Sequence, residues 1–230
     1  MDWGLYFYGA CEKYELFLLR DLVQDKAGAI FLDVGANIGQ HSLFMSQYCD
    51  VVHSFEPYEP VRRQLDSQID YNAINNIIVH GVGLGHTDCD MEFFAPKGAN
   101  TGTGSFVPSH ARDNNEFIGK LRVVNGDAYI SRLGLKKIDL IKIDVEGFEK
   151  AVLIGLRDTL IEYRPIVFLE FSSETKRSFE SEDEMMSLLP GYSAKKVQTN
   201  RPYCIFFNKP GYSYGEFNFN ISGGNLVFFP

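Results

Sequence analysis

Acidic side chains stand at the ends of four apolar runs in the chain. They are Asp33, Glu56, Asp144 and Glu170. If those runs are parallel strands, their carboxyl ends meet at one edge of a sheet, and the four carboxylates share a cleft. Carboxylates there can accept hydrogen bonds from a ligand, take a proton from a hydroxyl group, or hold a hard cation. The pattern therefore predicts a ligand site with acid–base or metal chemistry.

The elements that position these acids alternate from about residue 29 to about residue 190. Short apolar runs are followed by amphipathic stretches, which is typical of a parallel sheet with helical crossovers. Pro60 suits the first turn of the helix after the second strand, and Ser181 with Glu184 predicts a capping box. The five predicted strands cover residues 29–34, 51–56, 77–82, 138–144 and 165–170.

Residues 84–130 break this alternation because they are rich in Gly, Thr, Ser and Asn. We expect them to form an insertion or cover region over the sheet rather than a crossover helix. Within it, residues 91–94 and 121–124 are predicted short strands, and residues 101–105 are a candidate mobile cover.

The tail predicts an antiparallel hairpin over residues 192–230, because apolar runs at 203–207 and 225–229 are separated by Gly- and Asn-containing sequence. Residues 1–28 are expected to be a helical lead-in. With no linker or repeat in its 230 residues, the chain is predicted to be one α/β domain. Its sheet should be mostly parallel, with the hairpin at one edge.

The bulk composition disfavours several classes of partner and compartment. The formal net charge of −8, with no stripe of Lys and Arg, disfavours nucleic acid. No apolar run is long enough to span a membrane, and the start lacks a signal-peptide pattern. The cysteines form no Cys-x-x-Cys pair, so we expect neither a zinc ribbon nor a redox site but a reduced, cytoplasmic protein.

The turn after the first predicted strand, Asp33–Gly39, indicates the ligand. A dinucleotide fingerprint counted from Gly35 requires further glycines where Asn37 and Gln40 stand, so that fingerprint fails. An acid before Gly35 and a second glycine after it suit a ligand with an amino acid moiety, such as S-adenosylmethionine. Two other interpretations stay open: a tight turn without a ligand, and a nicotinamide oxidoreductase.

Glu56 supports the interpretation of this turn as part of an S-adenosylmethionine site. It ends the second predicted strand, where a carboxylate offers paired acceptors to the two ribose hydroxyls of a nucleoside. The alternative is an ordinary surface acid.

These segments resemble the FkbM family of methyltransferases, with four motifs in the family's order. The resemblance runs from about Tyr14 to the end of the chain, and between residues 84 and 129 it rests on Gly104–Phe106 and Asn125–Asp127. It implies a Rossmann-like class I methyltransferase fold with a seven-stranded sheet, S-adenosylmethionine as donor, and an oxygen acceptor, commonly a sugar hydroxyl. The four motifs are Phe31–Gly39, Phe55–Pro57, Ile138–Glu149 and Pro165–Glu170.

Together, the turn and the resemblance define a predicted cofactor site. Its members are Asp33, Gly35, Ala36, Asn37, Gly39, Glu56, Pro57, Gly83, Ser105 and Asp144.

For the chemistry, the enzyme must hold an acceptor in line with the methyl group and remove the proton of a hydroxyl acceptor. We predict Asp144, Glu146, Glu170 and Lys142 as catalytic residues. Either Mg²⁺ binds Asp144 and Glu170, or Glu146 or Glu170 acts as a base with Lys142 as counter-charge. The structural alternatives are an ion pair for Lys142, and helix-dipole charges for Glu146 and Glu149.

The predicted function is therefore O-methylation of a sugar hydroxyl on a glycan or glycosylated small molecule. A peptide or lipid-linked acceptor is the first alternative, and a cofactor-binding scaffold without catalysis is the second.

Overall fold

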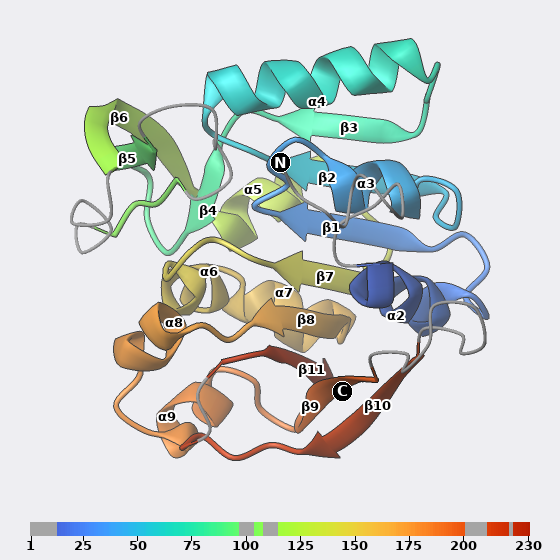
Figure 1. Ribbon diagram of the computed structural model, residues 1–230, viewed down its shortest axis with the longest axis vertical. Helices are drawn as coiled ribbons and strands as arrows, with labels where there is room; N and C mark the ends of the chain where they lie inside the picture. The colour runs from blue at the N-terminus through green and yellow to red at the C-terminus, as the bar shows by residue number, and fades with distance from the viewer. Residues whose placement is uncertain (1–12, 97–103, 108–114, 201–210, 221–222) are drawn as a thin grey trace.

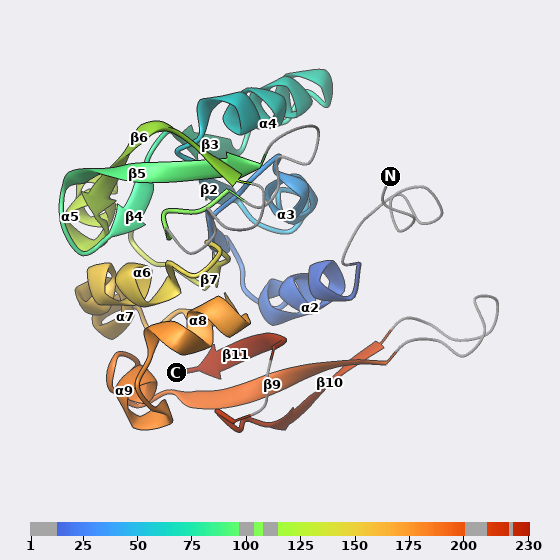
Figure 2. The ribbon, with the colours of Figure 1, turned by 60° about the vertical axis from the view of Figure 1, so that its left-hand side comes forward.

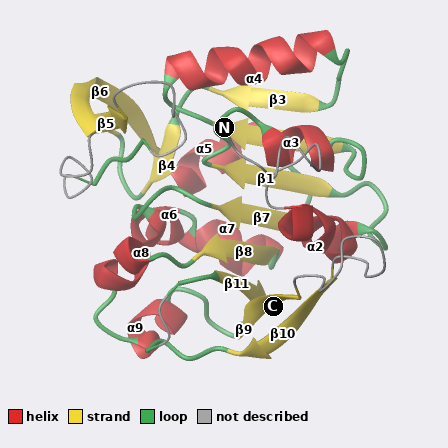
Figure 3. Ribbon diagram, viewed as in Figure 1, coloured by secondary structure: helices red, strands yellow, loops and turns green. Residues whose placement is uncertain are grey.

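The computed structural model describes residues 13–96, 104–107, 115–200, 211–220 and 223–230. Figure 1 shows the arrangement of the elements, and Figure 3 separates helices from strands. The helices are α2 (Lys13–Val23), α3 (Gln40–Met45), α4 (Glu59–Tyr71), α5 (Gly126–Leu133), α6 (Glu149–Gly155), α7 (Arg157–Tyr163), α8 (Ser173–Ser178) and α9 (Glu182–Ser187). The strands are β1 (Ile30–Val34), β2 (Val51–Phe55), β3 (Ile77–His80), β4 (Gly83–Gly85), β5 (Cys89–Pro96), β6 (Asn115–Asn125), β7 (Leu140–Ile143), β8 (Ile166–Glu170), β9 (Ser193–Asn200), β10 (Gly211–Glu216) and β11 (Asn225–Phe229).

The main sheet has the order β10-β9-β11-β8-β7-β1-β2-β3. Strands β3, β2, β1, β7 and β8 are parallel, and β11, β9 and β10 are antiparallel to their neighbours. The predicted α/β class, with a mostly parallel sheet and antiparallel C-terminal strands, is confirmed. No helix in the described ranges is long and apolar enough to cross a membrane.

The C-terminal region differs from the predicted two-stranded hairpin. Three strands form there, and β10 makes the sheet one strand wider than the predicted seven. Strand β10 is held because the Tyr212 hydroxyl donates to Asp21 of α2 (2.9 Å) and the Tyr214 ring packs against Phe229. Strand β9 is largely polar, which explains why its sequence did not indicate a strand. The predicted strand at 203–207 lies outside the described residues.

The alternation of side chains along β1 and β7 separates two cores. Leu32 and Val34 face α5, α6 and α7, whereas Phe31 packs with α2 and α3 on the other face. Asp33 of β1 lies opposite Lys142 of β7, on the same side as Phe31. The sheet thus brings a buried acid and a buried base together.

The region 84–130 combines an insertion with a crossover helix. Strands β4, β6 and β5 form a separate three-stranded sheet, which contains both predicted short strands. Figures 1 and 2 show this sheet beside the carboxyl ends of β1, β2 and β3. The expectation of no crossover helix was wrong, because α5 begins at Gly126, where Asn125 accepts a hydrogen bond from the Ala128 amide (2.8 Å). Residues 101–103 of the candidate cover lie outside the described ranges.

The predicted capping box at α9 is half formed. Ser181 Oγ accepts from the Glu184 amide (3.1 Å), as expected. The Glu184 carboxylate, however, accepts from the Glu180 amide (2.7 Å) and pairs with Lys150. The ion pair with Lys150 draws that carboxylate away from the cap residue.

Candidate functional site

The turn between β1 and α3 has a backbone that suits close contacts. Gly35, Asn37 and Gly39 all have positive φ, at 84°, 51° and 92°. A Cβ on Gly35 would lie 1.9 Å from the Asp144 carbonyl oxygen, and one on Gly39 would lie 2.1 Å from Leu65. Gly35 is therefore required by packing as well as by conformation, whereas at Gly39 the clash is with the end of a side chain and the positive φ is the firmer constraint.

Hydrogen bonds tie this turn to the end of β2. The Gly35 and Ala36 amides both donate to the Phe55 carbonyl, at 3.1 and 3.0 Å. The Asn37 amide donates to Glu56 Oε2 (3.0 Å). The turn and the acid after β2, predicted separately from the sequence, therefore form one unit.

Glu56 is buried, and each of its carboxylate oxygens has one backbone donor. Oε1 accepts from the Tyr58 amide (2.8 Å) and Oε2 accepts from Asn37, which leaves each oxygen a lone pair for a ligand diol. Burial raises the pKa of Glu56 to about 7. Arg62 donates to the carbonyls of Glu56 and Pro57, at 3.1 and 3.2 Å, and so fixes the chain after β2.

Asp33 lies beneath the turn and is completely buried. Its Oδ2 accepts from Ser42 Oγ (2.6 Å), while Oδ1 has no hydrogen-bond partner among the described residues and lies 3.8 Å from Lys142 Nζ. Burial raises the pKa of Asp33, although Lys142 and Ser42 act in the opposite direction. The Asp33 side chain therefore links β1 to α3 through Ser42 and lies beside Lys142 of β7, and its predicted role in cofactor binding stays a prediction.

Lys142 is also buried, and it joins the two acids beside it. Nζ donates to Asp144 Oδ2 (2.9 Å) and faces Asp33. Burial alone would lower the pKa of Lys142, but the charges of Asp144 and Asp33 raise it above its ordinary value. Its environment matches the ion pair that was the structural alternative for this residue.

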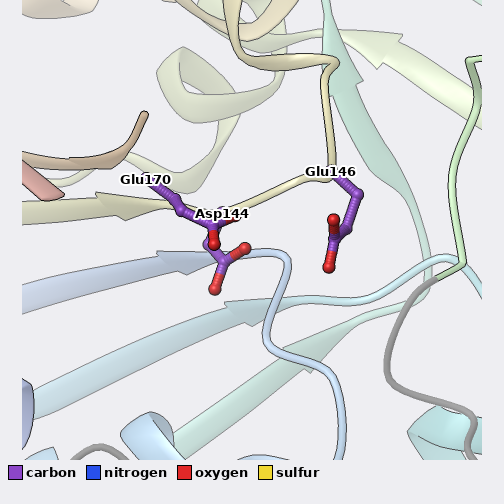
Figure 4. Close-up of side chains that lie close together, drawn as sticks. All are labelled: Asp144, Glu146 and Glu170. Carbon is purple, nitrogen blue, oxygen red and sulfur yellow. The ribbon is translucent and has the colours of Figure 1, made fainter. Parts of the chain in front are cut away.

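Asp144, Glu146 and Glu170 form a carboxylate cluster at the ends of β7 and β8 (Figure 4). One oxygen from each lies within 4.8 Å of the others, and Glu170 Oε2 is buried without a hydrogen-bond partner among the described residues. Like charges so close are unfavourable unless a proton or a cation lies among them. The cluster therefore suits proton transfer or cation binding.

The three members of the carboxylate cluster differ in protonation. Burial and then the Asp144 charge raise the pKa of Glu170 far above its ordinary value. Burial acts upward on Asp144 too, but Lys142 and Glu170 bring the pKa of Asp144 below its ordinary value. Burial and the Asp144 charge raise the pKa of Glu146 to about 7. These shifts favour the ionised form of Asp144 and the protonated form of Glu170, with Glu146 between the two.

Two residues of the predicted cofactor set lie apart from the turn at Gly35. Gly83 is part of β4, where a Cβ would be 3.2 Å from the Phe106 ring. Ser105 Oγ donates to the Glu146 carbonyl (2.7 Å) and so contacts the carboxylate cluster's own turn.

Sequence reasoning missed the part that Glu149 and Thr175 play. Glu149, expected to be a helix-dipole charge, is fully buried and binds backbone amides of the Glu146 turn. Thr175 donates to Glu149 (2.9 Å). The sequence signal for Thr175 was the start of α8, where Ser172 and Thr175 form a capping box.

Known proteins match this chain in sequence. The model of the methyltransferase FkbM domain matches residues 33–198. Methyltransferase 1 of Beauveria bassiana is 25% identical, over 68% of this chain and 73% of its own length. Hexuronic acid methyltransferase AglP of Haloferax volcanii is 28% identical, over 62% of this chain and 55% of its own. AMB antimetabolite synthetase AmbE of Pseudomonas aeruginosa is 30% identical, and the matched part spans 64% of this chain and 9% of AmbE.

Solved structures agree on the fold. The crystal structure of methyltransferase FkbM from Methylobacillus flagellatus has a TM-score of 0.54 at 18% identity, covering 88% of this chain and 44% of that chain. Precorrin 8w decarboxylase of Methanobacterium thermoautotrophicum reaches 0.53 at 11% identity, over 96% and 91% of the two chains. With the sequence match over 33–198, these findings show that the chain belongs to the FkbM family of S-adenosylmethionine-dependent methyltransferases.

Proposed function

We propose that this chain methylates a sugar hydroxyl, on a glycan or a glycosylated small molecule, with S-adenosylmethionine as donor. The carboxylate cluster of Asp144, Glu146 and Glu170 carries the proposal, because it supplies a proton acceptor beside the Gly35 turn. The name of AglP, a hexuronic acid methyltransferase, supports a sugar as the acceptor class.

The residues around the turn fit the donor. The free lone pairs of Glu56 suit ribose hydroxyls, and the positive φ of Gly35 and Asn37 turns the backbone at the end of β1. S-adenosylmethionine, when bound, supplies an electrophilic methyl group. Gly35 and Asn37 would hold it with Glu56, while Asp33 and Gly39 support the turn from the protein side.

Glu146 is the proposed general base. A hydroxyl acceptor must lose its proton as the new carbon–oxygen bond forms, and a base with a pKa near the working pH does this best. The pKa of Glu146 is raised to about 7, whereas Asp144 is already paired with Lys142. Glu170, protonated at neutral pH, acts as a neutral hydrogen-bonding group for Asp144.

The charge of the carboxylate cluster favours a neutral nucleophile. Lys142 lies beside the cluster, but its Nζ already donates to Asp144, so an acceptor carboxylate would meet like charges. We therefore expect a hydroxyl to be methylated, which gives a methyl ether, even when the acceptor is a uronic acid.

A divalent cation is a second role for the carboxylate cluster, favoured by its spacing within 4.8 Å. Hard cations such as Mg²⁺ take carboxylate oxygens, and a bound cation would lower the pKa of a sugar hydroxyl. Asp144 and Glu170 would then be ligands, together with Glu146. Loss of methyl transfer in EDTA, restored by Mg²⁺, would favour this role over the base.

The test is transfer of labelled methyl from S-adenosylmethionine to hexose and uronic acid glycosides, beside peptide and lipid-linked acceptors. We expect label on a glycoside that survives mild alkali, as an ether does. Glu146→Gln should lower turnover about 100-fold or more, on the scale of general base catalysis. Glu162→Gln, the same change on an exposed residue of α7, is the control. Label confined to peptide or lipid acceptors, or released by alkali, would contradict the proposal.

A further inference from the structure

The turn Val145–Gly147 holds its central residue in an uncommon conformation. Glu146 has a φ of 51° and Gly147 a φ of 94°. A residue with a Cβ adopts this left-handed region infrequently, and such outliers persist where the surroundings determine them. The contacts around the turn therefore decide where the Glu146 backbone lies, and so from which point and in which direction its side chain leaves the turn.

Glu149 holds the turn from the helix side. Its Oε1 accepts from the Val145 amide (3.0 Å) and the Gly147 amide (3.2 Å), the two that flank Glu146. Its Oε2 accepts from Thr175 Oγ1 (2.9 Å), on α8. Both side chains are completely buried, so water does not replace these bonds.

Ser105 holds the turn from the opposite side. Its Oγ donates to the Glu146 carbonyl (2.7 Å) and accepts from the Val107 amide (3.0 Å), with 1% of the residue exposed. Thr175 Oγ1 lies 3.3 Å from the Glu170 carbonyl, which joins this arrangement to the end of β8. The backbone of Glu146 is thus fixed at its carbonyl and at both neighbouring amides.

We propose that Glu149, Thr175 and Ser105 are positioning residues that hold the Glu146 carboxylate against Asp144 and Glu170. The inference rests on the proposed role of Glu146 as base. A base that is displaced by about 1 Å can lose a factor of about 100 in rate, so buried support of this kind has a direct catalytic effect.

Thr175→Val removes the hydroxyl at nearly constant shape, and Thr175→Ser keeps it. Turnover is measured for both, in the wild-type and in the Glu146→Gln background. We expect Thr175→Val to lower kcat about 10- to 100-fold, with S-adenosylhomocysteine affinity within about threefold. Thr175→Ser should keep most of the wild-type rate. In the Glu146→Gln background, Thr175→Val should lower the rate little further, because the effects of two substitutions are not additive when one residue acts through the other. Equal losses in both backgrounds would overturn the inference.

Amide hydrogen exchange gives a readout that does not need an acceptor. The amides of Val145 and Gly147 should exchange faster in Thr175→Val, and the turn should loosen likewise in Ser105→Ala. Ser178→Ala is the matched control, because its hydroxyl bonds within α8 to the Thr175 carbonyl (2.6 Å). Unchanged exchange in Thr175→Val would overturn the positioning role. Full turnover in Glu146→Gln would instead overturn the assignment of the base, and the two failures are thus distinguishable.

Discussion

Glu56 follows β2 and Glu170 ends β8, so both lie at the carboxyl edge of the parallel strands, yet their surroundings are opposite. Glu56 accepts two backbone amides and keeps a defined orientation. Glu170 has a buried oxygen with no donor among the described residues and lies against Asp144 and Glu146. A hydrogen-bonded acid suits recognition, whereas crowded acids suit proton transfer or a cation. One edge of the sheet therefore contains two kinds of carboxylate environment, for which we propose two different roles.

Lys142 connects the two sites, and its removal should have the largest effect. Lys142→Met would leave the buried Asp33 and the Asp144 carboxylate without their cation. We expect a loss of about 3–5 kcal/mol in the free energy of unfolding, measured with urea. Lys136→Met, on an exposed lysine, should change it by less than about 0.5 kcal/mol. If Lys142→Met and Lys136→Met changed the free energy of unfolding equally, Lys142 would not stabilise the buried acids beside it.

Gly35→Ala tests where the two sites touch. The new Cβ would meet the Asp144 carbonyl at 1.9 Å, so the turn must move away from β7. Gly134→Ala is the control, since Gly134 also has positive φ but nothing within 4 Å. We expect Gly134→Ala to cost about 1–2 kcal/mol of stability through its backbone conformation alone. Gly35→Ala should cost more and abolish S-adenosylhomocysteine binding; matching losses would argue against a tight contact.

The raised pKa of Glu56 gives the recognition site a pH dependence. With a folded pKa of about 7, Glu56 is mostly protonated at pH 6 and mostly ionised at pH 8. A ribose diol donates to the ionised form, so S-adenosylhomocysteine affinity should rise about tenfold from pH 6 to pH 8. Glu56→Gln should bind more weakly and lose that rise. An unchanged slope in this variant would assign the titration to another group.

Glu170 should show an effect that depends on pH and falls on stability rather than on cofactor binding. Because its folded pKa is raised, the wild type loses stability as pH rises from the unfolded value toward the folded one. Glu170→Gln removes this loss, so its stability relative to wild type should improve by about 1.4 kcal/mol for each pH unit between pH 5 and pH 8. Urea midpoints at both pH values provide the measurement, with Glu162→Gln as the control. A constant difference would mean that Glu170 is not perturbed by the other acids.

The elements of the fold that follow local patterns were predictable. Alternating apolar runs indicated β1, β2, β7 and β8, and therefore brought the strand-end acids to one edge. The polar strand β9 was missed because its stabilisation comes from β10 and β11 on either side, which a local pattern does not record.

For the candidate site, the sequence indicated which residues share an edge of the sheet, and their roles stay predictions. Asp33, Glu56 and the Asp144–Glu170 pair stood at strand ends, so their proximity followed from topology. The bond from Ser105 to Glu146 and the bond from Thr175 to Glu149 join residues 41 and 26 positions apart, and no spacing rule anticipates them. The burial of Asp33 beneath the turn likewise depends on packing of α3, through Ser42.

We propose that the Gly35 turn and Glu56 form the donor site. Calorimetric titration of S-adenosylhomocysteine into the wild type and Glu56→Ala tests it most directly. We predict binding in the micromolar range that weakens by about 1–3 kcal/mol in the variant, the scale for a lost buried hydrogen-bonding group. Absence of binding to the wild type, or equal affinity for the two proteins, would mean that the donor does not bind at the Gly35 turn and Glu56.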